Sequence, residues 1–269
     1  MLEKAVERVK SEIEDFGKSL FHTAVENPYN GISQIGSKVS RYTLPELNIT
    51  GAPDSGKSYG AMVGAAAGMA LDYYILSRLA GPVLGNLGGS GAAGVALRAG
   101  LVGSFYTGVL QPSDLASDSF LRDRFANGVV GGITFASLAS SAYGLNKSTL
   151  FAPLESRSLG GYLTLGALSG ASAGAAHAES YALFKEGNLL PSANNFVSDV
   201  GMYALIGASA GGFDWAYTRA EALLNAMHDG TVSIKNPMPK DQVLDQTSRQ
   251  RQASGQQRVD AVDGDRGRS

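Results

Sequence analysis

Residues 125–146 read FANGVVGGITFASLASSAYGLN, a run of 22 residues that carries no formal charge. Positions four apart line one face of an α-helix, and small residues recur at every fourth position of this run. They are Gly128, Gly132, Ala136, Ser140 and Gly144. A face without large side chains lets two helix backbones approach closely. The run therefore predicts a helix that packs against a neighbour along its glycine face.

The same spacing of small residues recurs along most of the chain. It occurs in apolar segments at about 59–80, 91–110, 158–186 and 193–228, and the quoted run belongs to a fifth segment, 115–145. Pro and Gly clusters separate the segments, and runs with the two-residue period of a strand are nearly absent. We therefore expect an all-α fold, a bundle of about five glycine- and alanine-rich helices over 59–228. The glycines assigned to helix packing are Gly60, Gly64, Gly68, Gly100, Gly108, Gly128, Gly132, Gly166, Gly170, Gly174, Gly207 and Gly211.

The helical region also contains an internal repeat. Shifting residues 91–113 by 79 positions onto 170–192 gives nine identities in 23. Chance in so biased a composition gives roughly two. We predict a duplicated helix–Pro–helix unit, with copies at about 91–145 and 158–228.

The two ends of the chain differ from this middle. Residues 1–26 predict an amphipathic helix, because the apolar residues Leu2, Val6, Val9, Ile13, Phe16 and Leu20 alternate at spacings of four and three. These residues form an apolar seam along one side of the helix. The seam is able to pack on the protein's own core, on a partner helix or on a membrane surface. Residues 27–58 are rich in Gly, Pro, Ser and Asn and predict an irregular linker. The polar tail at 229–269 predicts disorder.

Charge and composition exclude several kinds of chemistry. The net charge is -2, which gives no electrostatic footprint for nucleic acid. There is no cysteine, so a disulfide scaffold, a thiolate metal site and a cysteine nucleophile are excluded. The three histidines (His22, His177 and His228) are scattered, and we expect no metal site. The charged N-terminus lacks the pattern of a secretory signal peptide.

Two solvents remain open for the helical region. In water, a glycine inside a helix lowers the stability of that helix by roughly 1 kcal/mol relative to alanine. In the hydrocarbon of a membrane, backbone groups without hydrogen bonds are so costly that the chain forms a helix whatever its propensity. The 22-residue uncharged run at 125–146 and the 21-residue run at 158–178 are near the roughly 20 residues that a span needs. Against a membrane stand the many Ser, Thr and Asn residues, and charges at Asp72, Arg98 and Asp214 within apolar stretches.

Residues 51–58 read GAPDSGKS and match the phosphate-binding loop pattern in full. In such a loop Gly51 and Gly56 let the backbone N–H groups cradle phosphates, Lys57 reaches the β/γ-phosphates and Ser58 holds magnesium. That fold also needs several parallel strands and a strand ending in Asp, and the sequence shows neither. We therefore expect a turn that leads into the first glycine helix, and no bound cofactor.

The sequence favours a non-enzymatic, membrane-associated glycine-zipper protein with a structural, pore-forming or translocation-related role. The alternatives are a soluble, cytoplasmic interaction or scaffold module and a protein that binds nucleotide at 51–58. Expected partners are membrane lipid and, through the N-terminal seam, a partner helix or a second copy; we expect no nucleic acid. If the helices span a bilayer, four charges are candidates for pairing inside the bundle or a pore: Asp72, Arg98, Glu179 and Asp214.

Overall fold

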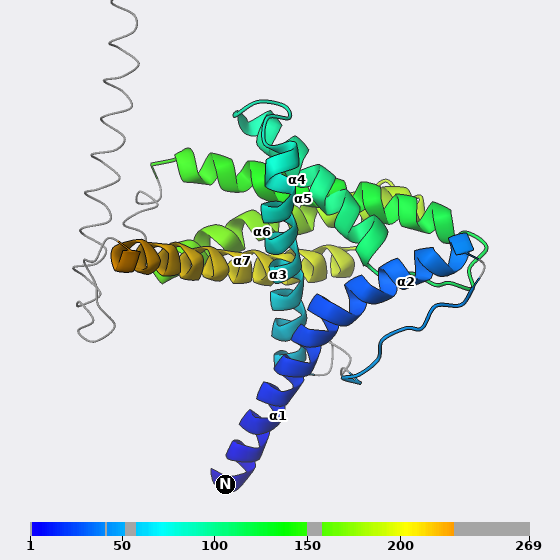
Figure 1. Ribbon diagram of the computed structural model, residues 1–269, viewed down its shortest axis with the longest axis horizontal. Coiled ribbons are helices and arrows are strands. Elements are labelled where there is room, and N and C mark those ends of the chain that lie inside the picture. The colour runs from blue at the N-terminus through cyan, green and yellow to red at the C-terminus, as the bar shows by residue number, and fades with distance from the viewer. Residues whose placement is uncertain (1, 41, 52–57, 150–157, 229–269) are drawn as a thin grey trace, which may run out of the picture. The chain divides into compact units, whose positions relative to one another are not determined.

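The computed structural model describes residues 2–40, 42–51, 58–149 and 158–228 (Figure 1). The described residues are helical apart from short connections, and no β-strand occurs among them. The predicted all-α class is therefore confirmed. The tail predicted at 229–269 lies outside the described residues.

Two compact units divide the chain within its last helix. The described residues up to Gly212 belong to the first unit, and 213–228 are the described part of the second. The second part continues the helix: Thr218 Oγ1 donates to the Asp214 carbonyl at 2.8 Å, and the Arg219 guanidinium lies 5.3 Å from the centroid of the Trp215 ring.

Helix α1 (Leu2–Phe21) continues through the π-helical turn η1 (His22–Glu26) into α2 (Asn27–Ser40). The irregular linker predicted at 27–58 is therefore wrong for its first 14 residues. A helix that continues from an existing one avoids the unfavourable nucleation step, so local Gly and Ser content does not prevent it. The extended chain after α2 is held to it by Asn30, whose side chain donates to the Leu47 carbonyl at 2.9 Å and accepts from the Leu47 N–H at 2.6 Å.

Helix α3 (Tyr59–Leu84) begins where Ser58 caps it, since the Ser58 hydroxyl accepts from the Ala61 N–H at 3.0 Å. The helix runs through Pro82, whereas the sequence predicted a break there. Pro82 lies in the last turn, so the helix loses only one hydrogen bond close to its end. The actual turn uses Gly88 and Gly89, which adopt φ of 74° and 77°, a region that favours glycine.

The remaining elements are α4 (Ala92–Phe105), η2 (Tyr106–Leu110), α5 (Phe120–Lys147), α6 (Leu159–Tyr181), η4 (Ala182–Glu186) and α7 (Ala193–His228). An α-helix, a π-helical turn, a loop and an α-helix thus follow one another twice. The starts of η2 and η4 lie 76 residues apart, not the 79 of the sequence repeat. The duplication therefore stays a prediction.

Three helix pairs contact each other at glycines. A Cβ added at Gly60 or Gly64 of α3 would lie under 3.0 Å from the backbone of α1. On α4, one at Gly100 would lie 3.1 Å from the Gly132 carbonyl of α5. The α6–α7 contacts follow the four-residue spacing, with Gly166 facing Gly207, Gly170 facing Tyr203 and Gly174 facing Asp199. Because one number rises as the other falls, α6 and α7 run antiparallel.

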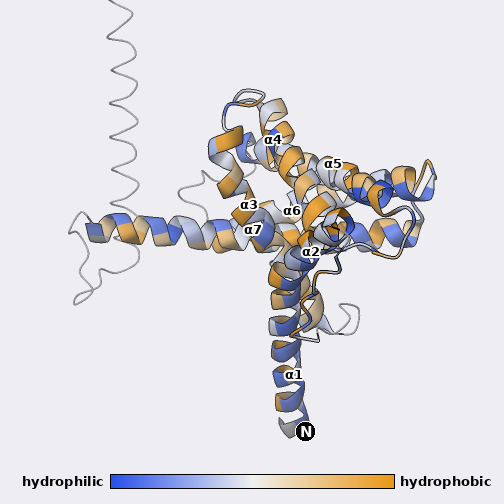
Figure 2. Ribbon diagram, turned by 45° about the vertical axis from the view of Figure 1, so that its right-hand side comes forward, coloured by the Kyte–Doolittle hydropathy of each residue, from blue (hydrophilic) through white to orange (hydrophobic). Residues whose placement is uncertain are grey.

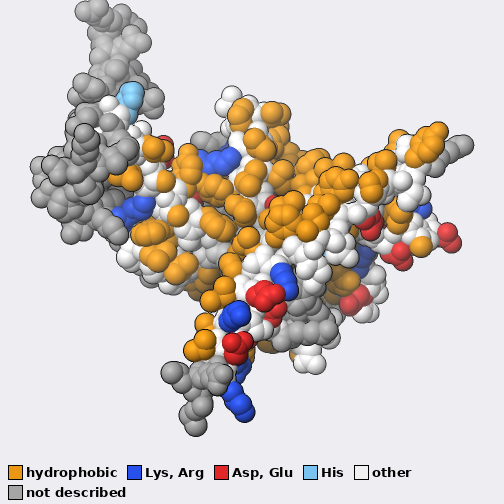
Figure 3. Space-filling model, turned by 60° about the horizontal axis from the view of Figure 1, so that its bottom comes forward, with side chains coloured by type: hydrophobic (Ala, Val, Ile, Leu, Met, Phe, Trp, Pro, Cys, Tyr) orange, Lys and Arg blue, Asp and Glu red, His pale blue; other side chains and the backbone are white. Residues whose placement is uncertain are grey.

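More than half of the buried hydrophobic side chains in the described part of the chain are alanines, while many of the exposed hydrophobic ones are large. Among the described residues, 11 of the 20 buried hydrophobic side chains are alanines, while 36 large hydrophobic side chains are exposed. The face in Figure 3 shows hydrophobic side chains over much of its surface. Blue prevails on α1 in Figure 2 and orange on α4. By length and composition, three described stretches are able to cross a membrane: Ala92–Leu110, Phe120–Lys147 and Ala193–Ala226.

Candidate functional site

Three antiparallel helices each contribute one polar side chain to the inside of the bundle. Thr134 lies on α5, His177 on α6 and Tyr203 on α7. The Nδ1 atom of His177 lies 3.0 Å from the Tyr203 hydroxyl and 3.3 Å from Thr134 Oγ1. Thr134 Oγ1 donates its single proton to the Val130 carbonyl at 2.7 Å, so at His177 it acts as an acceptor. The glycine contacts of α6 with α7 set the helix spacing at which this hydrogen bond to Tyr203 forms.

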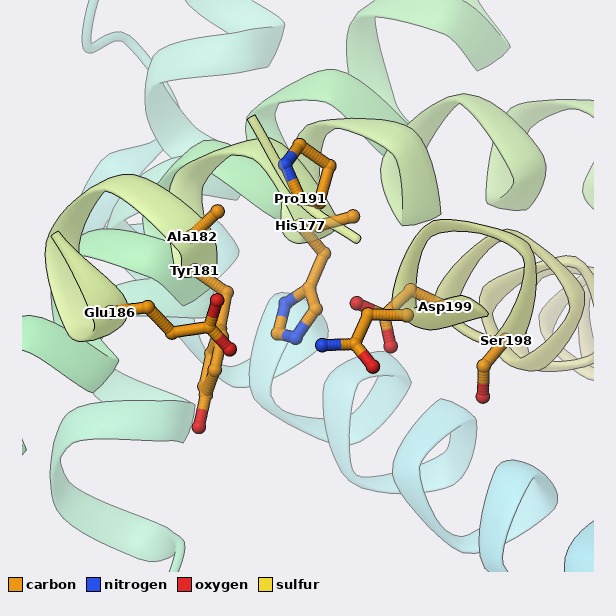
Figure 4. Close-up of a pocket in the computed structure, with 9 residues that line it drawn as sticks. His177, Tyr181, Ala182, Glu186, Pro191, Ser198 and Asp199 are labelled. Atoms are coloured by element: carbon orange, nitrogen blue, oxygen red, sulfur yellow. The ribbon is translucent and has the colours of Figure 1, made fainter. Parts of the chain in front are cut away.

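A pocket of about 170 Å³ opens beside His177, at the end of the α6–α7 hairpin. Figure 4 shows the His177 ring lying between Tyr181 and Asp199, with the Glu186 carboxylate near Tyr181. Neither Glu186 nor Asp199 forms an ion pair with Lys or Arg within the part of the chain that is described. The pocket thus combines one imidazole with two carboxylates that act on each other through space. Such groups bind protons and small cations.

A second set of buried polar atoms lies where α3 meets η2. Asp72 and Tyr106 are 7% and 2% exposed and lie close enough to interact. Even so, Asp72 Oδ2, the Tyr106 hydroxyl and Gln111 Nε2 have no hydrogen-bond partner among the described atoms. Buried polar atoms without partners are rare in folded proteins and often mark bound water or a functional site. Asp72 is the only one of the four predicted interior charges that the structure buries in this way.

The other three predicted interior charges have different surroundings. Arg98 is half-buried, and its Nη1 donates to the carbonyls of Gly85, Leu87 and Gly89 at 3.4, 2.9 and 2.7 Å. It therefore closes the α3–α4 turn instead of pairing with Asp72. Glu179 is exposed on α6, and Asp214 belongs to the second unit.

Arg124 is a buried charge that the sequence reasoning missed. It is 5% exposed, and its Nη1 donates to the Gly108 and Val109 carbonyls at 3.1 and 2.8 Å. Its Nη2 donates to the Gly31 carbonyl at 3.1 Å and to Gln34 Oε1 at 2.9 Å. Carbonyls at the end of a helical segment carry partial negative charge, which stabilises a cation. In sequence, Arg124 is one of several charges at the start of α5 and looks like part of a solvated helix end.

Glu26 anchors the chain that leads to residues 51–58. It is fully buried, and its carboxylate accepts from the N–H groups of Ile49 and Thr50 at 2.7 and 2.9 Å and from the Thr50 hydroxyl at 3.1 Å. His22 Nδ1 lies 2.5 Å from the other side of the carboxylate. Burial alone raises the pKa of Glu26, but the hydrogen bonds from His22, Thr50 and Ile49 outweigh it and lower the pKa below its ordinary range.

The predicted phosphate-binding loop is described only at its ends. Gly51 adopts a φ of 51° and the Ser58 hydroxyl caps α3, while Gly56 and Lys57 lie outside the described residues. The described part of the chain contains no strand, hence none of the parallel sheet on which such loops are normally built. It also contains no group of three or more metal-ligating side chains.

Comparison with protein-family models, with curated proteins and with solved structures finds no match to this chain. The geometry of the molecule therefore carries the functional argument by itself. The features that it offers are an apolar exterior, a bundle joined at glycines, and polar groups concentrated around His177 and Asp72.

Proposed function

We propose that the chain is a non-enzymatic membrane protein in which glycine contacts join the helices and the polar interior around His177 serves a pore or translocation role. The observation that carries the proposal is the inverted distribution of side-chain size. In a protein that folds in water, large apolar side chains are among those most often buried. In a bilayer, lipid solvates large apolar side chains, and small residues form the helix contacts.

The polar interior favours a pore or translocation role over a purely structural one. Polar and ionisable groups inside a membrane bundle are costly, and they typically mark ion or proton pathways. His177, Tyr203 and Thr134 come from three different helices, two of which are long and apolar enough to span. The adjacent pocket gives His177 access from the end of the bundle.

Fractionation of cells that express the full chain tests the membrane location. We expect the protein to sediment with membranes, to resist extraction by high salt or carbonate, and to dissolve in mild detergent. A variant without residues 1–26 should behave in the same way, because the proposal places the spans downstream. Monodisperse, helical protein in the soluble fraction without detergent would contradict the proposal.

Vesicles reconstituted with the purified protein test the role. We expect ion or proton flux that falls in His177→Ala and Tyr203→Phe, while Tyr143→Phe leaves it unchanged. Flux that is absent in the parent protein would leave a structural role as the better proposal. A soluble interaction module is the second candidate, because α1 presents an exposed apolar groove.

A further inference from the structure

Helix α1 and the start of α3 enclose an exposed apolar groove of about 480 Å³. Its walls include Val9 and Ile13 of α1 and Tyr59 of α3, which are 58%, 66% and 72% exposed. The groove exists because α3 contacts the side of α1 that carries Glu12, whose carboxylate accepts from the Gly60 N–H at 2.6 Å. The apolar seam of α1 is therefore left exposed from Val6 to Phe16.

The charge of α1 argues against a lipid surface as the cover of this groove. Helices that lie on membranes are rich in Lys and Arg, which attract anionic lipids. Helix α1 carries four basic residues (Lys4, Arg8, Lys10 and Lys18) and five acidic ones (Glu3, Glu7, Glu12, Glu14 and Asp15). Mixed charges beside an apolar seam with spacings of four and three are instead typical of helices that pair with another helix.

The two halves of α1 differ in charge. The first half carries Lys4, Arg8 and Lys10 against Glu3 and Glu7, whereas Glu12, Glu14 and Asp15 outnumber Lys18 in the second. Two copies that run antiparallel place the positive half of each against the negative half of the other. A parallel pair would instead place like halves together.

We propose that the groove is occupied by α1 of a second copy of this chain, running antiparallel and centred on Ser11. In this register Val9 of one copy faces Ile13 of the other, and Val6 faces Phe16, so a smaller side chain meets a larger one at each level. Lys10 and Glu14 lie four apart on one edge of the seam, and the two copies together form a charge-neutral group of four there. This inference does not depend on the membrane location.

Disulfide cross-linking tests the register directly, because the chain contains no cysteine of its own. Val9→Cys and Ile13→Cys are prepared separately in the full chain and then oxidised alone or as a mixture. We expect a dimer mainly in the mixture. In each single variant the two cysteines lie four residues apart along the axis, about 6 Å, so their Cβ atoms are too far apart for a bridge. Ser11→Cys lies on the opposite face of α1 and is the matched control.

The mass of the protein in solution, measured by light scattering, gives a second readout. The parent should be a dimer and Ile13→Glu a monomer with an unchanged thermal melt, because Ile13 is exposed in the single chain. Cross-linking of the single variants as efficient as that of the mixture would overturn the antiparallel register. A monomeric parent would overturn the proposal. Binding of the seam to lipid vesicles by such a monomer would show that lipid, and not a second copy, covers the groove. Failure to sediment with membranes would affect only the proposed function.

Discussion

Individual glycines allow close approach between the described helices of this protein. Gly166 and Gly207 face each other, and a Cβ added to either would meet the backbone of the other helix. A backbone neighbour has little room to move, unlike the flexible end of a side chain. The same residue type has a different role at Gly201, where a Cβ would meet nothing within 4 Å.

This contrast predicts opposite effects of one substitution within α7. Gly207→Ala should destabilise the protein by about 1–3 kcal/mol, because the added methyl group forces two backbones apart. Gly201→Ala should be neutral or should stabilise by up to about 1 kcal/mol, since alanine is the better helix former. The melting temperatures of the two variants are compared with that of the parent protein, in the solvent that keeps the parent folded. Equal effects would mean that Gly207 is not at a tight contact.

Glu26 predicts a specific dependence of stability on pH. Its pKa is lower in the folded chain than its ordinary 4.5, so its ionisation stabilises the fold above that pH. The contribution is lost as the pH falls from about 4.5 through the lower folded value. Glu26→Gln should cost about 1.5–3 kcal/mol at neutral pH, as for hydrogen bonds to a charged group. Unfolding measured between pH 7 and 3 should show the variant approaching the parent only at the acid end, whereas Asp118→Asn, at an exposed position, should follow the parent throughout.

At the scale of elements, Arg124 joins α2, η2 and α5. Its guanidinium donates to carbonyls of η2 and to Gly31 and Gln34 of α2. Gly31 also permits the approach, because a Cβ there would meet the Leu110 and Val109 backbone. Arg124 and Gly31 thus attach α2 to the glycine bundle, while α1 contacts α3 at Gly60 and Gly64.

Replacement of Arg124 should therefore loosen this junction. Arg124→Met should destabilise by about 1.5–3 kcal/mol or more, since buried carbonyls lose their donors. Arg124→Lys keeps the charge but not the planar fork of donors, so an intermediate loss is expected. The exposed neighbour gives the control Arg122→Met, which should change the melting temperature little. If proteolysis at the end of α2 increases in Arg124→Met but not in Arg122→Met, the destabilisation lies at the junction.

At the scale of the whole molecule, the solvent decides the effect of a charge on the outer surface. Ile133 lies in the middle of α5 and is 40% exposed. In water, Ile133→Lys should change stability by no more than about 0.5 kcal/mol. At the centre of a membrane span the same change costs roughly 3 kcal/mol. We therefore expect Ile133→Lys to reduce the protein recovered in membranes, with Leu121→Lys at the start of α5 as the tolerated control. Normal recovery of Ile133→Lys would contradict a membrane-spanning α5.

The helical class and the faces of the helices were determined by the sequence alone. A four-residue spacing of glycines and a seam such as Val6, Val9 and Ile13 are local patterns, and the helical period turns them directly into faces. The same local reading failed for 27–40, because a stretch with weak propensity becomes helical when it continues from a neighbouring helix.

Only the tertiary structure decided which of these faces meet. The burial of Arg124, the hydrogen bond between His177 and Tyr203, and the open groove beside Ile13 depend on the register between helices far apart in the chain. That register is set by the packing of whole helices, in which each glycine must find a backbone that fits it. No local pattern contains the position of its partner, and for this reason the polar interior and the exposed seam emerge only once the helices are assembled.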